Sequence, residues 1–244
     1  MSKFSLLFFV FLRAFVPLWQ IFIISYMITK LHLAPIICII ILLFADTSHS
    51  LTLDEVIDRV QERYEKTKNF QADFTQTSIL KTVKQKQISK GKVFIRKPGM
   101  MRWEYKTPEE QFIISDGKTI WFYVPIDKQV MMNNISSNLD SNSPNTFLAG
   151  SGKLRDTFNI EFEPEGTVPS PQYLLKLIPK KSQPNMAKLI IGVNKEDFKI
   201  EMSRVYDIYG NQTIVSFSNI EINKELSEGI FHFEVPQGVR VVTQ

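Results

Sequence analysis

The chain has 244 residues, of which 44% are hydrophobic, 12% aromatic and 22% charged, and its formal charge is +4. The first 50 residues hold three of the 29 basic and one of the 25 acidic side chains, so the remainder of the chain is nearly neutral. This composition is typical of a globular protein and gives no electrostatic case for nucleic-acid binding.

Cysteine and histidine are nearly absent from residues 51–244, which contain no cysteine and one histidine, His232. Zinc sites need three or four such ligands, and Ser-His-Asp or Cys-His catalysis needs a histidine beside a nucleophile. The sequence therefore predicts no metal site and no catalytic centre of these kinds, and we expect no cofactor.

The N-terminal region has the pattern of a secretory signal. Lys30 supplies the basic residue, residues 33–44 form an apolar core, and Ser48 and Ser50 are small residues suited to a cleavage site. The core has twelve residues, fewer than the roughly 20 that a helix needs to cross a bilayer. We predict that residues 1–50 are a signal-peptide region cleaved near Ser50, and that the protein is exported.

Two alternatives concern this region. An earlier apolar run is interrupted by Arg13 and Pro17, and Met27 stands just ahead of the signal pattern, so translation could begin at Met27. In the competing interpretation residues 1–44 stay in place as a membrane anchor. Cys38 lies inside the apolar core without the small residues that lipidation sites use, so we interpret it as an ordinary core cysteine.

A helix is predicted directly after the signal region. Apolar residues recur there at spacings of three and four: Leu53, Val56, Ile57, Val60 and Tyr64. Thr52 followed by Glu55 matches a capping box, which marks the start of a helix.

From residue 70 onward the hydrophobic period changes to two, which is typical of half-buried strands. Strands are predicted at 70–75, 83–89, 91–96, 101–105, 111–115, 119–124, 129–133, 160–163, 173–178, 188–193, 200–206, 213–222 and 231–235. Asp116-Gly117 predicts a type I′ hairpin turn. Residues 135–152 break the rhythm and are interpreted as a loop with a short apolar helix. We predict one domain over 51–244, a curved antiparallel sheet with a helix or two against it.

Three side-chain groups allow a functional and a structural interpretation. The pairs Met100-Met101 and Met131-Met132 stand beside aromatic segments and suit either a pocket for flexible acyl chains or an ordinary core. A basic cluster around Pro98-Gly99 suits either a gate or a solvated turn; it contains Arg96, Lys97 and Arg102. The acidic pairs Glu109-Glu110 and Glu161 with Glu163 suit either a two-carboxylate hydrolase or a solvated face.

Four segments carry a resemblance to a known family. They are 69–76 (NFQADFTQ), 91–105 (GKVFIRKPGMMRWEY), 114–125 (ISDGKTIWFYVP) and 231–242 (FHFEVPQGVRVV). Together they resemble the periplasmic outer-membrane lipoprotein carriers of the LolA family, over most of residues 51–244.

The resemblance implies a mainly β fold, an unclosed antiparallel β-barrel covered by a helical lid, whose apolar interior shelters lipoprotein acyl chains. It implies acylated lipoproteins as cargo, an inner-membrane ABC-type release complex (LolCDE-like) as donor and an outer-membrane receptor (LolB-like) as acceptor. It further implies a carrier that is not an enzyme and works as a monomer. A receptor or an envelope-stress sensor of the same fold, or a secreted hydrolase using the acidic pairs, are the alternatives.

The resemblance also suggests site residues. The expected lipid-binding residues are Tyr64, Phe74, Phe94, Met100, Met101, Trp103, Trp121, Phe147 and Leu148. The family has a functional arginine immediately before the proline of its R-P-G motif, thought to tie the barrel to its lid, and this chain has Lys97 there. Lysine offers a point charge where arginine offers a rigid fork of donors. Lys97 is our gate candidate, and strand alternation is expected to place Arg96 on the opposite face.

Overall fold

The structure is a computed structural model that describes residues 51–135, 152–164, 172–183 and 185–243. Residues Leu51–Gln244 form one compact unit. The predicted signal region, with the start at Met27 and Cys38, lies outside the described residues, as do Phe147 and Leu148. Within the described part of the chain, no helix is long and apolar enough to cross a membrane.

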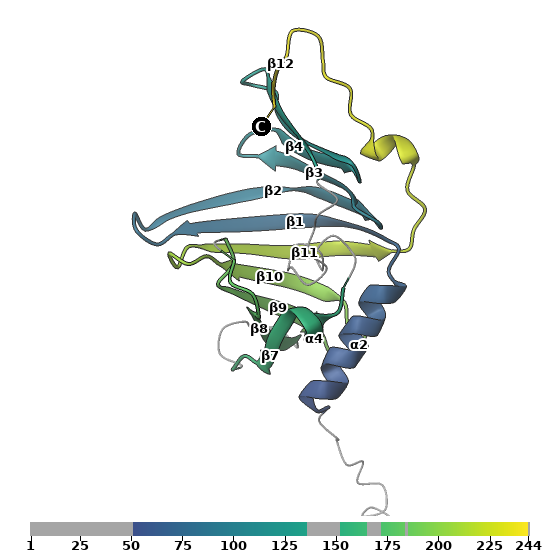
Figure 1. Ribbon diagram of the computed structural model, residues 1–244, viewed down its shortest axis with the longest axis vertical. Helices are drawn as coiled ribbons and strands as arrows, with labels where there is room; N and C mark the ends of the chain where they lie inside the picture. Colours follow the sequence, from purple (N-terminus) through teal and green to yellow (C-terminus); the bar gives the residue numbers. More distant parts are fainter. Residues whose placement is uncertain (1–50, 136–151, 165–171, 184, 244) are drawn as a thin grey trace, which may run out of the picture. The chain divides into compact units, whose positions relative to one another are not determined.

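Twelve strands of the described chain form a single sheet (Figure 1). Their bounds are β1 Asn69–Leu80, β2 Gln85–Arg96, β3 Met100–Thr107, β4 Gln111–Asp116, β5 Thr119–Val124, β6 Gln129–Asn134, β7 Phe158–Phe162, β8 Gln172–Pro179, β9 Lys188–Asn194, β10 Ile200–Tyr206, β11 Gln212–Ile222 and β12 Arg240–Thr243. The spatial order is β12-β6-β5-β4-β3-β2-β1-β11-β10-β9-β8-β7, so the end strands do not meet and the sheet stays open. Every pairing is antiparallel except that of β12 with β6.

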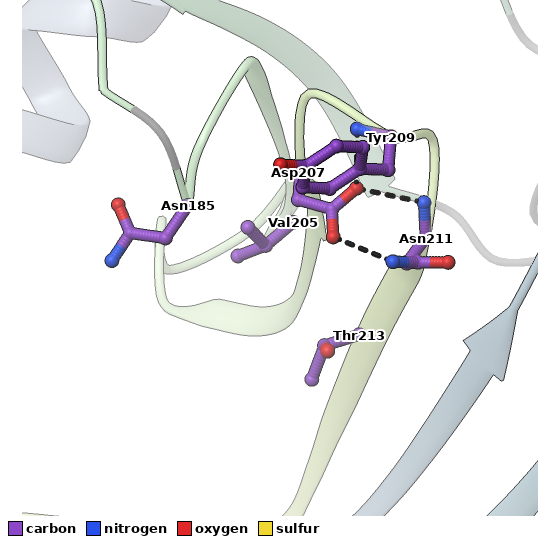
Figure 2. A pocket seen from close by; sticks show the side chains of 6 residues that line it. All are labelled: Asn185, Val205, Asp207, Tyr209, Asn211 and Thr213. Carbon is purple, nitrogen blue, oxygen red and sulfur yellow. Dashed lines mark hydrogen bonds between the residues drawn. The ribbon is translucent and has the colours of Figure 1, made fainter.

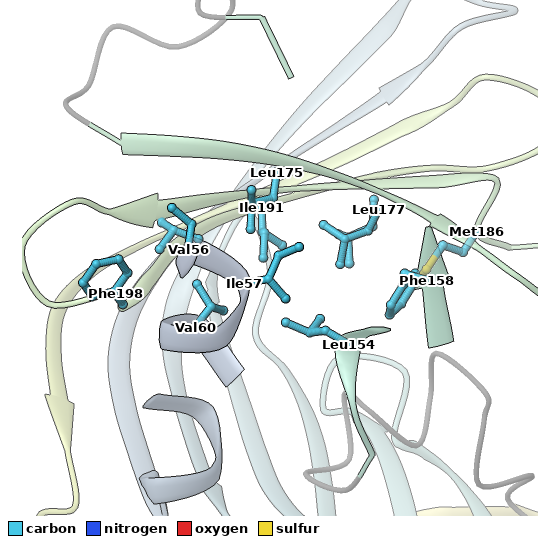
Figure 3. Packing of buried hydrophobic residues seen from close by; sticks show 12 residues of the cluster. Val56, Ile57, Val60, Leu154, Phe158, Leu175, Leu177, Met186, Ile191 and Phe198 are labelled. Carbon is cyan, nitrogen blue, oxygen red and sulfur yellow. The ribbon is translucent and has the colours of Figure 1, made fainter. Parts of the chain in front are cut away.

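The predicted N-terminal helix is confirmed as α2, Leu53–Lys66. Thr52 and Glu55 form the expected capping box, in which the Thr52 side chain accepts from the Glu55 backbone N–H and the Glu55 carboxylate accepts from the Thr52 backbone N–H. Figure 3 shows Val56, Ile57 and Val60 of α2 pointing at buried side chains of the sheet. Burial of this apolar stripe, rather than helix propensity, holds α2 in place.

The cluster beneath α2 is the larger core of the protein. Its sheet residues come from β7, β8 and β9, and a short helix, α4 (Leu154–Thr157), adds Leu154. Its buried members are Val56, Ile57, Val60, Leu154, Phe158, Leu175, Leu177, Met186, Leu189, Ile191, Val193 and Phe198. Side chains alternate between sheet faces along each strand, so the register assigns every strand residue to the face that α2 covers, here called the α2 face, or to the opposite face.

Most strand predictions are confirmed, with two corrections. The strands predicted at 83–89 and 91–96 are parts of one strand, β2, which has a register shift at Gly91 rather than a break. It begins at Gln85, because Val83 lies in the turn before it. A Cβ at position 91 would lie 1.8 Å from the Glu104 carbonyl oxygen, so glycine lets β2 and β3 come together under the Phe74 ring.

The predicted strand at 231–235 is wrong. Residues Glu228–Phe231 form a 3₁₀ turn, η1, and the strand lies later, at β12. Phe231 and Phe233 are instead used to cover the face opposite α2, where Phe233 packs at 5.9 Å from Trp121 and 5.4 Å from Tyr123 between ring centroids. Apolar alternation of two residues does not distinguish a strand from an extended segment that packs on a sheet.

The hairpin joining β4 and β5 is confirmed, but its turn is not type I′. Among its residues Gly117 has a positive φ, 91°, and Asp116 does not. Asp116 stays in β4, where its Oδ1 accepts hydrogen bonds from the backbone N–H of Lys118 and of Thr119 at 2.8 and 2.7 Å. These hydrogen bonds stabilise the turn without the positive φ at Asp116 that a type I′ turn would require.

Candidate functional site

The α2 face has two parts. The helix-covered part spans β7–β10 and is buried beneath α2 and α4. The strand-only part spans β11 and β1–β6, and the cluster at its centre contains strand residues and no residue of a described helix. The buried members of that cluster are Ala72, Phe74, Val93 and Val215, with partly buried aromatic and aliphatic side chains around them.

Aromatic rings dominate the strand-only part. The Phe74 ring, 2% exposed, meets Trp103 and Tyr105 edge-on, each at 4.9 Å between centroids. Phe70 meets Phe217 of β11 in the same way at 5.4 Å. These contacts fix the ring orientations and form a rigid apolar floor on the sheet.

The apolar surface continues from this floor toward the open edge of the sheet. The register pairs Trp103 with Ile113, Ile113 with Phe122, and Phe122 with Met131, which places all four on the α2 face. Met101 lies beside Trp103 on the same face through its pairing with Ile95. All five side chains remain partly exposed. The strand-only part is therefore a half-buried apolar surface that crosses seven consecutive strands.

The structure brings together some of the expected lipid-binding residues and separates others. Phe74, Met101 and Trp103 lie on the strand-only part, and Tyr64 lies in the last turn of α2. Three expected residues point to the opposite face: Phe94, Met100 and Trp121. Each is next in sequence to a residue of the α2 face, and adjacent residues of a strand point to opposite faces. These three residues therefore lie outside the strand-only part.

Sequence reasoning missed several side chains of the strand-only part. Ile113, Phe122, Met131 and Phe217 share the face of Trp103, whereas Trp121 was chosen in place of its neighbour Phe122. The sequence of one strand shows that its side chains alternate between the two faces of the sheet. Which of the two sets faces α2 depends on the register between strands. Each methionine pair contributes one side chain to each face, Met101 and Met131 to the α2 face.

A polar pocket of about 250 Å³ adjoins this apolar surface, toward the end of the sheet away from α2. Ile113 and Phe122 belong to both, and most of the remaining lining consists of amides and hydroxyls: Gln76, Ser78, Gln87, Ser89, Tyr105, Thr107 and Gln111. Burial raises the pKa of Tyr105, so its hydroxyl stays protonated and donates to Gln76 Oε1 at 3.0 Å. Glu109 is the acidic residue of this lining.

A second pocket, of about 350 Å³, lies at the turn between β10 and β11 (Figure 2). The Asp207 carboxylate in its wall accepts hydrogen bonds from the backbone N–H of Tyr209 and Asn211, both at 2.9 Å, and from Asn211 Nδ2 at 2.7 Å. Because these bonds occupy the carboxylate, Asp207 shapes the turn rather than offering a ligand site.

Lys97 links the end of β2 to α2. Its ammonium donates to the backbone carbonyl oxygen of Tyr64 at 2.5 Å and lies 3.4 Å from the centroid of the Tyr64 ring. The carbonyl belongs to the last helical turn, where a cation is favoured by the helix dipole. Burial lowers the pKa of Lys97 to about 8, and the nearby Glu65 carboxylate opposes that shift.

Arg96 lies on the opposite face, as strand alternation predicted. Its guanidinium donates to the carbonyl oxygen of Leu226 and lies 5.3 Å from the centroid of Phe231. Arg102, on the same face, donates to the carbonyl oxygen of Ile230 at 3.3 Å. The basic cluster is thus no solvated turn, since Lys97 holds the N-terminal helix and the two arginines hold the C-terminal segment.

The acidic pairs do not form a two-carboxylate site. Glu109 and Glu110 are exposed in the β3–β4 turn, and Glu161 forms an ion pair with Lys176. Across the residues that the structure describes, no cluster of three or more His, Cys, Asp or Glu side chains is placed to bind a metal ion.

An open sheet with a helix over one part of a face and a broad apolar surface beside it is typical of proteins that bind apolar ligands. Residues 65–234 match the model of the family "Outer membrane lipoprotein carrier protein LolA". The chain belongs to this family.

Curated relatives support the assignment along most of the chain. An outer-membrane lipoprotein carrier protein of Methylococcus capsulatus is 31% identical over 75% of this chain and 85% of its own length. One from Nitrosospira multiformis is 29% identical over 83% of this chain and 94% of its own length. The crystal structure of a LolA superfamily protein from Nitrosomonas europaea covers 75% of this chain and 99% of its own, with 13% identity and a TM-score of 0.41.

Proposed function

We propose that this protein shelters the acyl chains of lipoproteins on the strand-only part of the α2 face and carries them across the periplasm. The observation that supports it most strongly is the half-buried apolar surface formed by Trp103, Ile113, Phe122, Met101 and Met131 in a member of a lipoprotein-carrier family. The donor is an inner-membrane ABC-type release complex, and the acceptor is a receptor at the outer membrane.

The physical need for such a carrier follows from the cost of exposing hydrocarbon to water. Each exposed methylene costs roughly 0.8 kcal/mol, so one acyl chain of sixteen carbons costs about 12 kcal/mol. Aromatic rings and unbranched methionines suit this cargo, because rings supply area at little entropic cost and methionine adapts to flexible chains. Binding is reversible and uses no covalent step, so no catalytic residue is needed.

Release requires that cargo binding not be maximal. A competing empty state, in which the chain covers its own apolar surface, lowers the apparent affinity for cargo by the fraction of protein that is closed. In this proposal Lys97 stabilises that state by holding the Tyr64 carbonyl and ring. Arg96 takes no part in this contact, because it holds the C-terminal segment on the other face.

The two methionine pairs provide a matched test of the lipid-binding face. The variant Met101→Ser/Met131→Ser removes apolar area from the α2 face, and Met100→Ser/Met132→Ser makes the same chemical change on the opposite face. With a fluorescent diacylated lipopeptide as ligand, we expect the first variant to bind at least tenfold more weakly and the second to bind within about threefold of the parent.

Equal losses for the two variants, or the larger loss for Met100→Ser/Met132→Ser, would refute the assignment of the α2 face. Native mass spectrometry of the protein recovered from a periplasmic fraction tests the function itself, since a carrier retains acylated cargo. Denaturing mass spectrometry of the same sample gives the N-terminus and so tests cleavage near Ser50.

A further inference from the structure

The hairpin formed by β1 and β2 extends past its neighbours at the end of the sheet away from α2 (Figure 1). β2 pairs with β3 only from Lys90 onward, so residues 85–89 have no partner on that side. On the other side β1 stays paired with β11 as far as Ile79 and Gln212. The backbone N–H of Lys81 donates to Asn211 Oδ1 at 3.0 Å, which joins the end of this hairpin to the β10–β11 turn.

These two turns, residues 80–88 and 207–210, are here called the tip. The tip exposes apolar side chains: Leu80 at 46%, Val83 at 64%, Ile88 at 48%, Ile208 at 55% and Tyr209 at 73%. They are half of the ten exposed large hydrophobic side chains recorded for the described chain, concentrated in two short adjacent segments. Clustering of this kind indicates a contact surface rather than the scattered exposure that is normal for a protein surface.

The tip is positively charged. Lys81, Lys84, Lys86 and Lys90 lie on the hairpin, and the sequence has no acidic residue between Asp73 and Glu104. None of the four lysines forms an ion pair with another residue that the structure describes. Nearby carboxylates are Glu109 and Glu110 at the base of the hairpin, and Asp207, which is occupied by its own turn.

We propose that the tip contacts the anionic surface of a lipid bilayer. Lysines attract anionic headgroups and can extend along apolar surface while the ammonium stays in water. Leu80, Val83, Ile208 and Tyr209 then enter the headgroup region, as aliphatic and aromatic residues do in interfacial segments. An excess of lysine with aliphatic side chains at a protruding end favours a membrane as the partner. An acidic protein surface would instead be matched by hydrogen-bond donors held in a fixed arrangement.

The position of the tip relates this contact to cargo. The polar pocket is lined by hairpin residues of the α2 face, Gln76, Ser78 and Ser89, and by Ile113 and Phe122 of the apolar surface. On the α2 face the pocket therefore lies between the tip and the strand-only part, whereas Lys86 and Ile88 of the tip point to the opposite face. Membrane contact does not depend on the proposed cargo, because it is measured with vesicles alone.

The experiment is flotation of the full chain with vesicles of phosphatidylglycerol and phosphatidylcholine in a 1:3 ratio, and with phosphatidylcholine alone. Lys81→Gln/Lys84→Gln/Lys86→Gln is the tip variant. Lys68→Gln/Lys118→Gln/Lys153→Gln is the control, with the same charge change at exposed lysines elsewhere. We expect at least a tenfold loss of binding to anionic vesicles for the tip variant and less than a twofold loss for the control.

A second variant and a direct probe complete the test. Leu80→Ser/Val83→Ser changes exposed side chains, so it folds normally, and we expect it to weaken binding severalfold while the salt dependence remains. An environment-sensitive dye at Val83→Cys, in a Cys38→Ser background, is expected to shift to the blue with anionic vesicles, whereas the dye at Lys118→Cys is not. The probe reports the tip even if the hydrophobic N-terminus also binds lipid.

Equal binding by the tip and control variants, together with no dye shift at Val83→Cys, would overturn the proposal. Loss of transfer from inner-membrane vesicles without loss of lipid binding would also overturn it, in favour of a protein partner. Lipopeptide affinity distinguishes the two proposals: the tip variant is expected to keep the parent affinity for a soluble diacylated lipopeptide, whereas Met101→Ser/Met131→Ser loses it and still binds vesicles.

Discussion

The two parts of the α2 face carry similar side chains and differ in what lies against them. In the helix-covered part, Leu175 and Leu177 of β8 are fully buried beneath α2. In the strand-only part, Trp103, Phe122 and Met131 stay partly exposed, although they occupy equivalent positions in the same sheet. One part therefore stabilises the fold, and the other keeps apolar area available for a ligand. The difference comes from α2 and α4, whose residues pack on the first part, whereas no residue of a described helix joins the cluster of the second.

The largest expected effect tests the stabilising part. Leu175→Ala should lower the free energy of unfolding by about 3 kcal/mol, because it removes a buried side chain and leaves a cavity under α2. Urea denaturation measures this loss. Lipopeptide affinity, measured on the folded fraction, should change less than threefold. A stability change below about 1 kcal/mol would show that α2 does not form the core on this side.

The complementary change tests the ligand-binding part. Phe122→Ala should cost only about 1–2 kcal/mol of stability, because the ring is half-buried, but weaken lipopeptide binding about tenfold. The same titration and denaturation experiments apply. If Phe122→Ala destabilises the protein as much as Leu175→Ala and leaves affinity unchanged, then the two parts do not differ in the way described.

The link between the parts is tested at Lys97. Lys97→Leu removes the contact with the Tyr64 carbonyl in the last turn of α2 and should weaken the proposed closed state, so lipopeptide binding should become about two- to fivefold tighter and release to an acceptor slower. Lys97→Arg, which keeps a cation at this position, is the control and should stay near the parent. Unchanged binding and release in Lys97→Leu would remove Lys97 from the gating proposal.

The smallest expected effect is on the pH dependence of stability. The pKa of Lys97 is lowered from 10.5 to about 8 in the folded protein, so the unfolded chain holds more protons between these values and stability rises with pH across this window. Solvent screening limits the gain to less than about 1 kcal/mol. Arginine stays protonated, so Lys97→Arg should lack this gain in urea denaturation at pH 7 and pH 9.5. An identical rise in both proteins would assign it to other groups.

Local features of the fold were predictable because neighbours in sequence produce them. The capping box at Thr52 and Glu55 and the apolar stripe of α2 depend on contacts within two turns of helix. The strand predicted at 119–124, an apolar run that follows the Asp116-Gly117 turn, has the observed bounds of β5. The C-terminal segment was not predictable in this way, since Phe231 and Phe233 alternate as a strand would and yet pack as a cover on the sheet.

The candidate site shows the same division. Met101 and Trp103 were predicted through the family resemblance, and Arg96 was expected on the far face from alternation alone. Trp121, Phe94 and Met100 were also expected to bind lipid, but they lie on the opposite face, because a shift of one residue moves a side chain through the sheet. The exposed lysines and aliphatic residues of the tip were visible in the sequence, but their exposure was not.

The sequence by itself determined the mainly β class, the N-terminal amphipathic helix, the scarcity of metal ligands and nucleophiles, and the resemblance to lipoprotein carriers, because these depend on periodicity, composition and short motifs. The tertiary structure decided which alternate side chains face α2, which apolar residues stay partly exposed, and that Lys97 reaches the helix while Arg96 reaches the C-terminal segment. The physical reason is that the face and burial of a strand residue are set by register and packing between segments distant in the chain.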